Sequence, residues 1–204
     1  MRILAVTLVA LAAGSASFAD DKPGAWLEPG ARVAGTLGLL YNVTGLDVYH
    51  ERYHCLLTDY GLDPTVMIVV RGADQLENPS VVKLLQEIDT AVGKNTVKRL
   101  HAFVVVLDPS INDIVKDDAA RYKLEKKLDA FAKDKLGKGT PMALCLCTEG
   151  QMDKFPLDKD VQVALVFYNN HRVALSKTFA KDQISDDEAM KTVKDGLGKI
   201  LPAK

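Results

Sequence analysis

The sequence predicts an α/β domain with a central mixed sheet, in which a parallel βαβ half is followed by a C-terminal β-hairpin and a helix. Two apolar runs, Val66–Val70 and His101–Leu107, have the composition of strands buried on both faces. An amphipathic helical pattern separates them, and strand, helix and strand in this order favour a right-handed crossover between parallel strands. Nearer the C-terminus, two alternating segments flank a turn, which indicates an antiparallel hairpin.

The N-terminus has the pattern of a signal peptide. Arg2 supplies a positive charge, Ile3–Ala13 is almost entirely apolar, and Ser17-Phe18-Ala19 places small residues where a signal peptidase cuts. The apolar run is too short to cross a bilayer of about 30 Å as a helix. We therefore expect residues 1–19 to be removed after Ala19, and residues 20–204 to form one exported domain, periplasmic or secreted, without a membrane span.

The charge balance argues against two classes of partner. The chain has 26 Lys and Arg against 27 Asp and Glu, a net charge of −1. No excess of positive charge is present for nucleic acid or for an anionic membrane surface. A domain of this length can bury a core without disulfides or metal ions, and we predict no cofactor and no metal site.

In the segments before the first predicted helix, the sequence indicates secondary structure with unequal clarity. Ala31–Tyr41 suits a strand or a hairpin arm, although its glycines weaken the pattern. Asn42-Val43-Thr44 is a glycosylation sequon, whose use depends on the host. After Val66–Val70, a polar loop leads to a helix predicted from about Ser80 to Gly93, which Gly93 is expected to end. Its apolar residues recur at spacings of three and four: Val81, Leu84, Leu85, Ile88 and Val92.

The second half continues with a helix, a strand, the hairpin and a last helix. A charged helix is predicted from about Asp117 to Leu136, with Tyr122, Leu128, Phe131 and Leu136 facing the core. Met142–Cys147 is a third buried strand, and Val161–Phe179 forms the hairpin around Asn169-Asn170-His171. The last helix opens with the capping box Ser185–Glu188, and its inner residues are Met190, Val193, Leu197, Ile200 and Leu201.

Short motifs around the first buried strand carry a family resemblance. They are Tyr41–Gly45 (YNVTG), His54-Cys55, and Tyr60-Gly61 followed by Pro64–Met67 (PTVM). Together with the order of elements, they resemble exported thioredoxin-like proteins, in the peroxiredoxin-like elaboration of that fold. In that group a C-x-x-C, a Tyr-Gly and a proline lead into the first core strand. The resemblance spans most of the mature chain and implies a thioredoxin-like fold with a redox motif at Cys55.

This chain departs from the family pattern at the sulfur positions. Thr58 stands where the group has its second cysteine, so the C-x-x-C is degenerate. Ordinary thioredoxins place C-x-x-C directly after the central strand, and here that place holds Arg71-Gly72-Ala73-Asp74. Thr140-Pro141 is a candidate for the cis-proline that such folds place beside the active site.

Cys55 and His54 are the candidate catalytic residues. A nucleophilic thiol needs a lowered pKa, and His54 or Arg52 is near enough in sequence to stabilise a thiolate. The alternative is that Cys55 is a small buried residue. That alternative is favoured, because catalytic sites in parallel sheets lie beyond the carboxyl ends of the strands, whereas Cys55 precedes its strand.

The other two cysteines, Cys145 and Cys147, lie two residues apart on a predicted strand and share a face. Their expected Cα separation approaches the upper limit for a disulfide. Core packing is therefore the favoured role, while a bridge from either one to Cys55 stays open.

The segment His50–His54 (HERYH) matches the zinc-protease pattern H-E-x-x-H. On a helix this spacing would bring both imidazoles to one face. Arg52 would place a cation beside the metal, and the segment lies close to the break at Asp59–Pro64. We therefore do not expect a zinc protease, while metal binding by His50, His54 and Cys55 without catalysis stays open.

Two functions are compatible with these features. In the first, the domain is a non-catalytic binding or structural module with a protein partner, which keeps the fold and has lost the chemistry. In the second, it is a single-cysteine thiol-disulfide oxidoreductase or peroxidase-like protein that acts through Cys55 on a thiol partner. The missing second cysteine favours the first. The sequence alone leaves open whether the protein is an enzyme, which partner it has and how it oligomerises.

Overall fold

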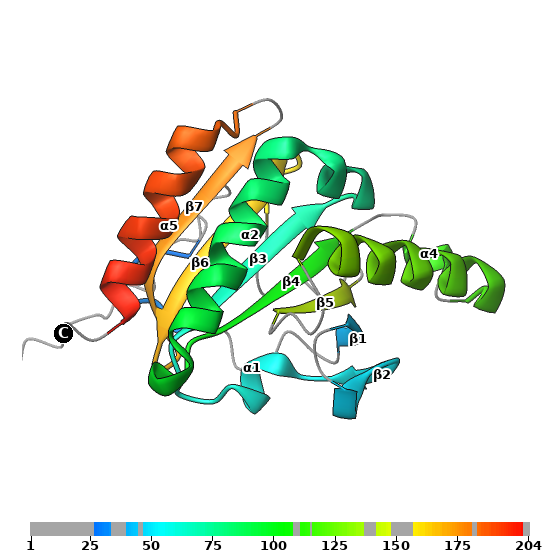
Figure 1. The fold of residues 1–204 in the computed structure, drawn as a ribbon, viewed down its shortest axis with the longest axis horizontal. Coiled ribbons are helices and arrows are strands. Elements are labelled where there is room, and N and C mark those ends of the chain that lie inside the picture. The colour runs from blue at the N-terminus through cyan, green and yellow to red at the C-terminus, as the bar shows by residue number, and fades with distance from the viewer. Residues whose placement is uncertain are drawn as a thin grey trace, which may run out of the picture.

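The computed structural model describes residues 27–33, 40–44, 47–107, 111–114, 116–136, 142–147, 157–180 and 183–201. In this part of the chain, seven strands form one mixed sheet in the order β2-β1-β5-β4-β3-β6-β7, and α2, α4 and α5 lie on one side of it (Figure 1). The strands are β1 (Leu40–Thr44), β2 (Arg52–His54), β3 (Thr65–Arg71), β4 (His101–Leu107), β5 (Met142–Cys147), β6 (Val161–Asn169) and β7 (Arg172–Ala180). The helices are α1 (Leu56–Asp59), α2 (Pro79–Lys94), α3 (Ile111–Ile114), α4 (Asp118–Phe131) and α5 (Asp186–Ile200).

Two predicted features lie outside the described residues, namely the signal peptide at residues 1–19 and the proline at position 141. Among the helices that are described, none combines the length and the apolar character needed to cross a bilayer.

Strand β3 is an inner strand of the sheet, as the sequence predicts. It pairs in parallel with β4 and antiparallel with β6, so that Val66 lies between Ala102 and Phe167. Every residue from Val66 to Val70 is buried. Two covered faces leave no position for a polar side chain, which explains the uninterrupted apolar run. The parallel βαβ half of the predicted sheet is therefore confirmed.

Helix α2 connects β3 to β4 and confirms the predicted amphipathic pattern, since all five predicted apolar residues are buried. The Asn78 side chain caps its N-terminus, and Pro79 occupies the first turn, where the missing N–H costs no hydrogen bond. The predicted stop at Gly93 is wrong by one residue. The helix continues to Lys94, and the side-chain amide of Asn95 donates to the carbonyl oxygen of Ala91 at 2.8 Å.

Helix α4 begins at Asp118 and is followed by a π-helical turn over Ala132–Leu136. Leu128 and Leu136 are buried as predicted, and Phe131 packs against the core. The prediction for Tyr122 is wrong, because its side chain is 57% exposed. It lies six residues before Leu128, a spacing that places the two on different faces of a helix, and the Lys126 ammonium lies over its ring.

The predicted hairpin and last helix are also confirmed. Asn170 and His171 form the turn between β6 and β7, both with positive φ (51° and 57°), as a two-residue hairpin turn requires. Helix α5 starts after Ser185, whose hydroxyl accepts a hydrogen bond from the Glu188 N–H. Inside α5, a Cβ on Gly196 would come within 2.5 Å of the Phe167 ring, so glycine allows the helix to approach the sheet closely.

The N-terminal region differs most from prediction. Strand β1 starts at Leu40, near the end of the predicted segment 31–41, and pairs antiparallel with both β2 and β5. Residues 34–39 lie outside the described part. The sequon residue Asn42 is fully buried, and its side-chain amide donates to the carbonyl oxygens of Leu40 and Arg52. Asn42 is therefore inaccessible to glycosylation in the folded chain.

Candidate functional site

The carboxyl end of β3 is where an α/β sheet of this type presents its ligand sites. Here the strand ends at Arg71 and turns sharply at Gly72, whose φ of 88° suits glycine. A Cβ at Gly72 would also collide with the Asp74 carboxylate. A 3₁₀ helix over Ala73–Glu77 then leads into α2. Ala73 and Leu76 of this 3₁₀ helix are buried in the core, whereas Asp74 and Gln75 line a pocket beyond the end of the strand.

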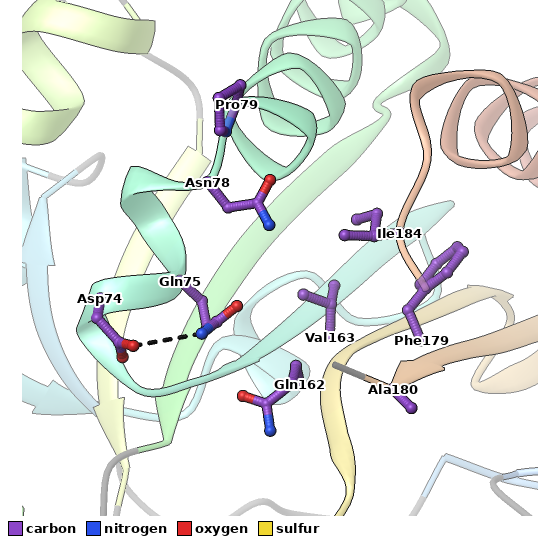
Figure 2. A pocket seen from close by; sticks show the side chains of 9 residues that line it. All are labelled: Asp74, Gln75, Asn78, Pro79, Gln162, Val163, Phe179, Ala180 and Ile184. Atoms are coloured by element: carbon purple, nitrogen blue, oxygen red, sulfur yellow. Dashed lines mark hydrogen bonds between the residues drawn. The ribbon is translucent and has the colours of Figure 1, made fainter. Parts of the chain in front are cut away.

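A pocket of about 340 Å³ opens at this edge (Figure 2). We call it the β3-edge pocket. It is built from three places: the segment between β3 and α2, the start of β6, and the end of β7 with the loop after it. Its lining residues are Asp74, Gln75, Asn78, Pro79, Gln162, Val163, Phe179, Ala180 and Ile184.

The polar side of the pocket consists of one carboxylate and three carboxamides. The Gln75 side-chain N–H donates to the Asp74 carboxylate at 3.3 Å. The Asn78 side-chain oxygen accepts from the Ser80 backbone N–H at 2.9 Å. Gln162 lies at a register shift in the pairing of β6 with β7, and such bulges re-aim side chains next to functional sites. The apolar side consists of Val163, Phe179 and Ile184.

Arg71 secures the chain that enters β6. Its Nε donates to the carbonyl oxygen of Val161 at 3.0 Å, and one of its terminal nitrogens lies 3.5 and 3.4 Å from the carbonyl oxygens of Leu157 and Asp158. These bonds link the last residue of β3 to the first of β6 and fix the relative position of two pocket walls. A guanidinium suits this role because it offers several donors in a rigid plane.

None of the described lining residues of the pocket carries a sulfur atom. Within the residues that the structure describes, no group of three or more His, Cys, Asp or Glu side chains is placed to hold a metal ion.

Cys55, the candidate nucleophile, lies elsewhere. It precedes α1 as the N-cap residue, and its Sγ accepts a hydrogen bond from the Thr58 hydroxyl at 3.2 Å. The side chain is partly buried against the core cluster that contains Tyr168. Tyr168 pairs with Thr65, the first residue of β3. Cys55 therefore belongs to the amino end of β3, and Gly72 follows its carboxyl end (Figure 1). A seven-residue strand separates its two ends by about 20 Å.

His54 makes its contacts away from the thiol. Its ring stacks on Tyr49, with 3.5 Å between the ring centroids, and its Nε2 lies 3.4 Å from the Asp59 carboxylate. In the described part of the chain, no hydrogen bond or ion pair joins His54 or Arg52 to Cys55. His54 and Cys55 are neighbours in the chain, and their described side-chain contacts are made with different partners.

The H-E-x-x-H segment is not helical. His50 and Glu51 lie in a turn, Glu51 has a φ of 57°, and Arg52–His54 forms β2. The helical spacing that would bring both imidazoles to one face is therefore absent from this segment, as the sequence context suggested.

Cys145 is fully buried in β5, and its thiol donates to the Asn42 side-chain oxygen at 3.2 Å. Cys55 and Cys145 are both reduced thiols and form no bridge to each other. The backbone of Cys147 ends β5 opposite Leu107 of β4, and its side chain lies outside the described part. Core packing, the favoured prediction, accounts for Cys145.

Sequence reasoning did not find the pocket residues Gln75, Asn78 and Gln162. For Asn78 the sequence holds one signal, since Asn-Pro before an amphipathic run marks a helix start at the end of a polar loop. Gln162 had no such signal, since a bulge inside an alternating strand is set by pairing rather than by local sequence.

Comparison with known proteins identifies the fold. No family model and no curated protein matches the sequence. Among solved structures, a cysteine-to-serine mutant of peroxiredoxin Q from Xylella fastidiosa superposes with a TM-score of 0.53 at 13% identity, covering 84% of this chain and 98% of that chain. A protein assigned as thiol:disulfide interchange protein DsbE from Chlorobium tepidum has a TM-score of 0.51 at 10% identity, covering 85% and 99%. An uncharacterized conserved protein from Geobacillus kaustophilus has a TM-score of 0.53 at 12% identity, covering 87% of each chain. At these identities the likeness shows a common fold. The chain has a thioredoxin-like domain, as predicted.

Proposed function

We propose that this chain is an exported thioredoxin-fold binding module that works without thiol-disulfide chemistry and holds its ligand in the β3-edge pocket. The observation that carries the proposal is the composition of the carboxyl end of β3. Gly72 and Ala73 follow the strand, and carboxamides line the pocket beyond them. A thiol-exchange site would need a sulfur there, beside the substrate.

The position of Cys55 supports the same conclusion. It lies at the other end of β3, and Thr58 takes the place that a resolving sulfur would need. Cys55 therefore lacks the C-x-x-C partner whose attack would release a mixed-disulfide intermediate.

The test compares amide NMR spectra of the purified protein in reduced and in oxidised glutathione. We expect the resonances of residues 55–60 to superpose, because the proposed function involves no redox cycle at Cys55. A second set of resonances at these residues in oxidised glutathione, absent from a Cys55→Ser variant, would overturn the proposal.

A second candidate function rests on one contact. The Thr58 hydroxyl donates to Cys55 Sγ, the sulfur of a partly exposed free thiol. This contact suits a single-cysteine oxidoreductase or peroxidase-like protein that acts on a thiol partner. The same NMR comparison tests it, since such a protein would show the second set of resonances.

A further inference from the structure

We infer that the β3-edge pocket recognises an extended peptide, by pairing the backbone N–H and C=O of one ligand residue with the side chains of Gln75 and Asn78. This inference rests on the proposed binding function and names the chemical class of its ligand.

A contact with the backbone fixes the orientation of the Asn78 side-chain amide. Its Oδ1 accepts from the Ser80 backbone N–H. A backbone N–H can only donate, so the atom that faces it has to be the oxygen. The Nδ2 of Asn78 is therefore the end that remains for a ligand, and it offers N–H donors.

A contact with Asp74 fixes the orientation of the Gln75 side-chain amide in the same way. Its Nε2 donates to the Asp74 carboxylate. An ionised carboxylate can only accept, so the atom that faces it has to be the nitrogen. The Oε1 of Gln75 is the end that remains, and it offers an acceptor.

Together these two side chains present one donor and one acceptor to the same space. Figure 2 shows the Asn78 nitrogen and the Gln75 oxygen both turned toward Val163. One residue of an extended peptide carries the complementary pair on one side, because its carbonyl oxygen can accept from Asn78 while its own N–H donates to Gln75. An anion would meet the Asp74 carboxylate, and a cation would meet the N–H donors of Asn78. A neutral amide satisfies both sides.

The apolar side of the pocket favours a peptide over a saccharide. The accessible apolar residues of its lining are Pro79, which is exposed, and Ile184, which is half-buried, and they suit an aliphatic side chain next to the bound residue. Phe179 is only 1% exposed, so its ring offers no open face on which a sugar could stack. A pocket of about 340 Å³ accommodates one such side chain with its adjoining peptide units.

The experiment titrates the ¹⁵N-labelled protein with N-acetyl-leucine N-methylamide and follows the side-chain NH₂ resonances of Asn78 and Gln162. We expect a downfield shift at Asn78 that saturates with probe concentration. N-acetyl-N-methyl-leucine dimethylamide keeps the carbonyl groups and the side chain but has no N–H, and we expect it to bind about tenfold more weakly or worse.

The decisive variant is Asn78→Asp. Aspartate caps a helix as well as asparagine does, so the fold is kept while the donor is replaced by an acceptor. We expect at least a tenfold loss of affinity for N-acetyl-leucine N-methylamide. Asn170→Asp is the matched control, because it makes the same charge change at an exposed turn between β6 and β7. We expect its affinity to be unchanged.

Three results would overturn the inference: no saturable shift at Asn78, equal binding by the Asn78→Asp variant, or pocket shifts caused by maltotriose in place of the amide probe. None of them bears on redox chemistry at Cys55. They would therefore not contradict the proposed function. Redox cycling at Cys55 would contradict it, whichever ligand the pocket binds.

Discussion

The Thr58 hydroxyl lies 3.2 Å from the Cys55 sulfur, across the single turn of α1. A C-x-x-C motif would place its second sulfur at this position. A single residue, threonine in place of cysteine at position 58, therefore separates this chain from a dithiol at the same place, and the backbone that would hold the dithiol is present.

This geometry predicts that a Thr58→Cys variant closes a disulfide with Cys55. The two side chains already touch, so the sulfurs can reach bonding distance by a side-chain rotation. After oxidation with glutathione disulfide and unfolding, we expect the Thr58→Cys protein to have two titratable thiols, those of Cys145 and Cys147, which is also the number in a Cys55→Ser variant. Two additional reactive thiols in the oxidised Thr58→Cys protein would contradict the prediction.

The close approach of α5 to the sheet predicts opposite effects for two nearby glycines. Gly196→Ala would place a methyl group within 2.5 Å of the buried Phe167 ring, and overpacking of this kind costs about 1–3 kcal/mol. Gly198→Ala meets no atom within 4 Å in the described structure, and it should stabilise the helix by about 0.5–1 kcal/mol. Urea unfolding of both variants tests this pair, and a Gly196→Ala protein as stable as the wild type would refute it.

Arg71 links the end of β3 to the chain before β6 through three backbone carbonyl oxygens. We expect Arg71→Lys to lower the free energy of unfolding by about 1–3 kcal/mol, because lysine cannot reproduce the planar set of donors. Arg172→Lys provides a comparison, since Arg172 donates to a single exposed carbonyl, that of Gly30. Equal losses for the two variants would show that the Arg71 contacts contribute no more than one exposed bond.

The burial of Tyr60 predicts that the free energy of unfolding falls at alkaline pH. Burial raises the pKa of Tyr60 above its ordinary value, and the nearby Cys145 and Asp59 add to this. A group whose pKa is raised on folding contributes stability that is present below its unfolded pKa, about 10 for tyrosine, and that is lost as pH rises beyond it. We therefore expect Tyr60→Phe to reduce the loss of unfolding free energy between about pH 10 and pH 12.

At neutral pH, the same variant should be nearly as stable as the wild type. The Tyr60 hydroxyl has no hydrogen-bond partner among the described residues, so its removal should cost no more than about 1 kcal/mol. Tyr122→Phe, at an exposed tyrosine, should leave the alkaline loss unchanged. An alkaline loss that is the same in Tyr60→Phe as in the wild type would show that Tyr60 is not its source.

The sequence predicts the central elements well because their signals are local. Val66–Val70 is apolar without interruption because both faces of β3 are covered, and the spacing of the apolar residues in α2 follows from one buried face. Tyr122 was misplaced because aromatic residues suit a core, yet its position in the helical period points to solvent.

The candidate site was harder to predict because its residues meet only after folding. Gln75 and Asn78 are ordinary polar residues of a loop until β6 and β7 bring Gln162 and Phe179 beside them. The sequence suggests a catalytic role for Cys55 because this residue is next to His54. In the structure, β2 and α1 direct the two side chains to different contacts.

The most direct test of the central claim is a turnover measurement on the purified protein, with insulin disulfides and dithiothreitol in one assay and hydrogen peroxide and dithiothreitol in the other. We predict that the wild type and the Cys55→Ser variant both give the rate of the protein-free reaction. A wild-type rate above that background, lost in Cys55→Ser, would contradict the claim that this thioredoxin fold binds its ligand without redox chemistry.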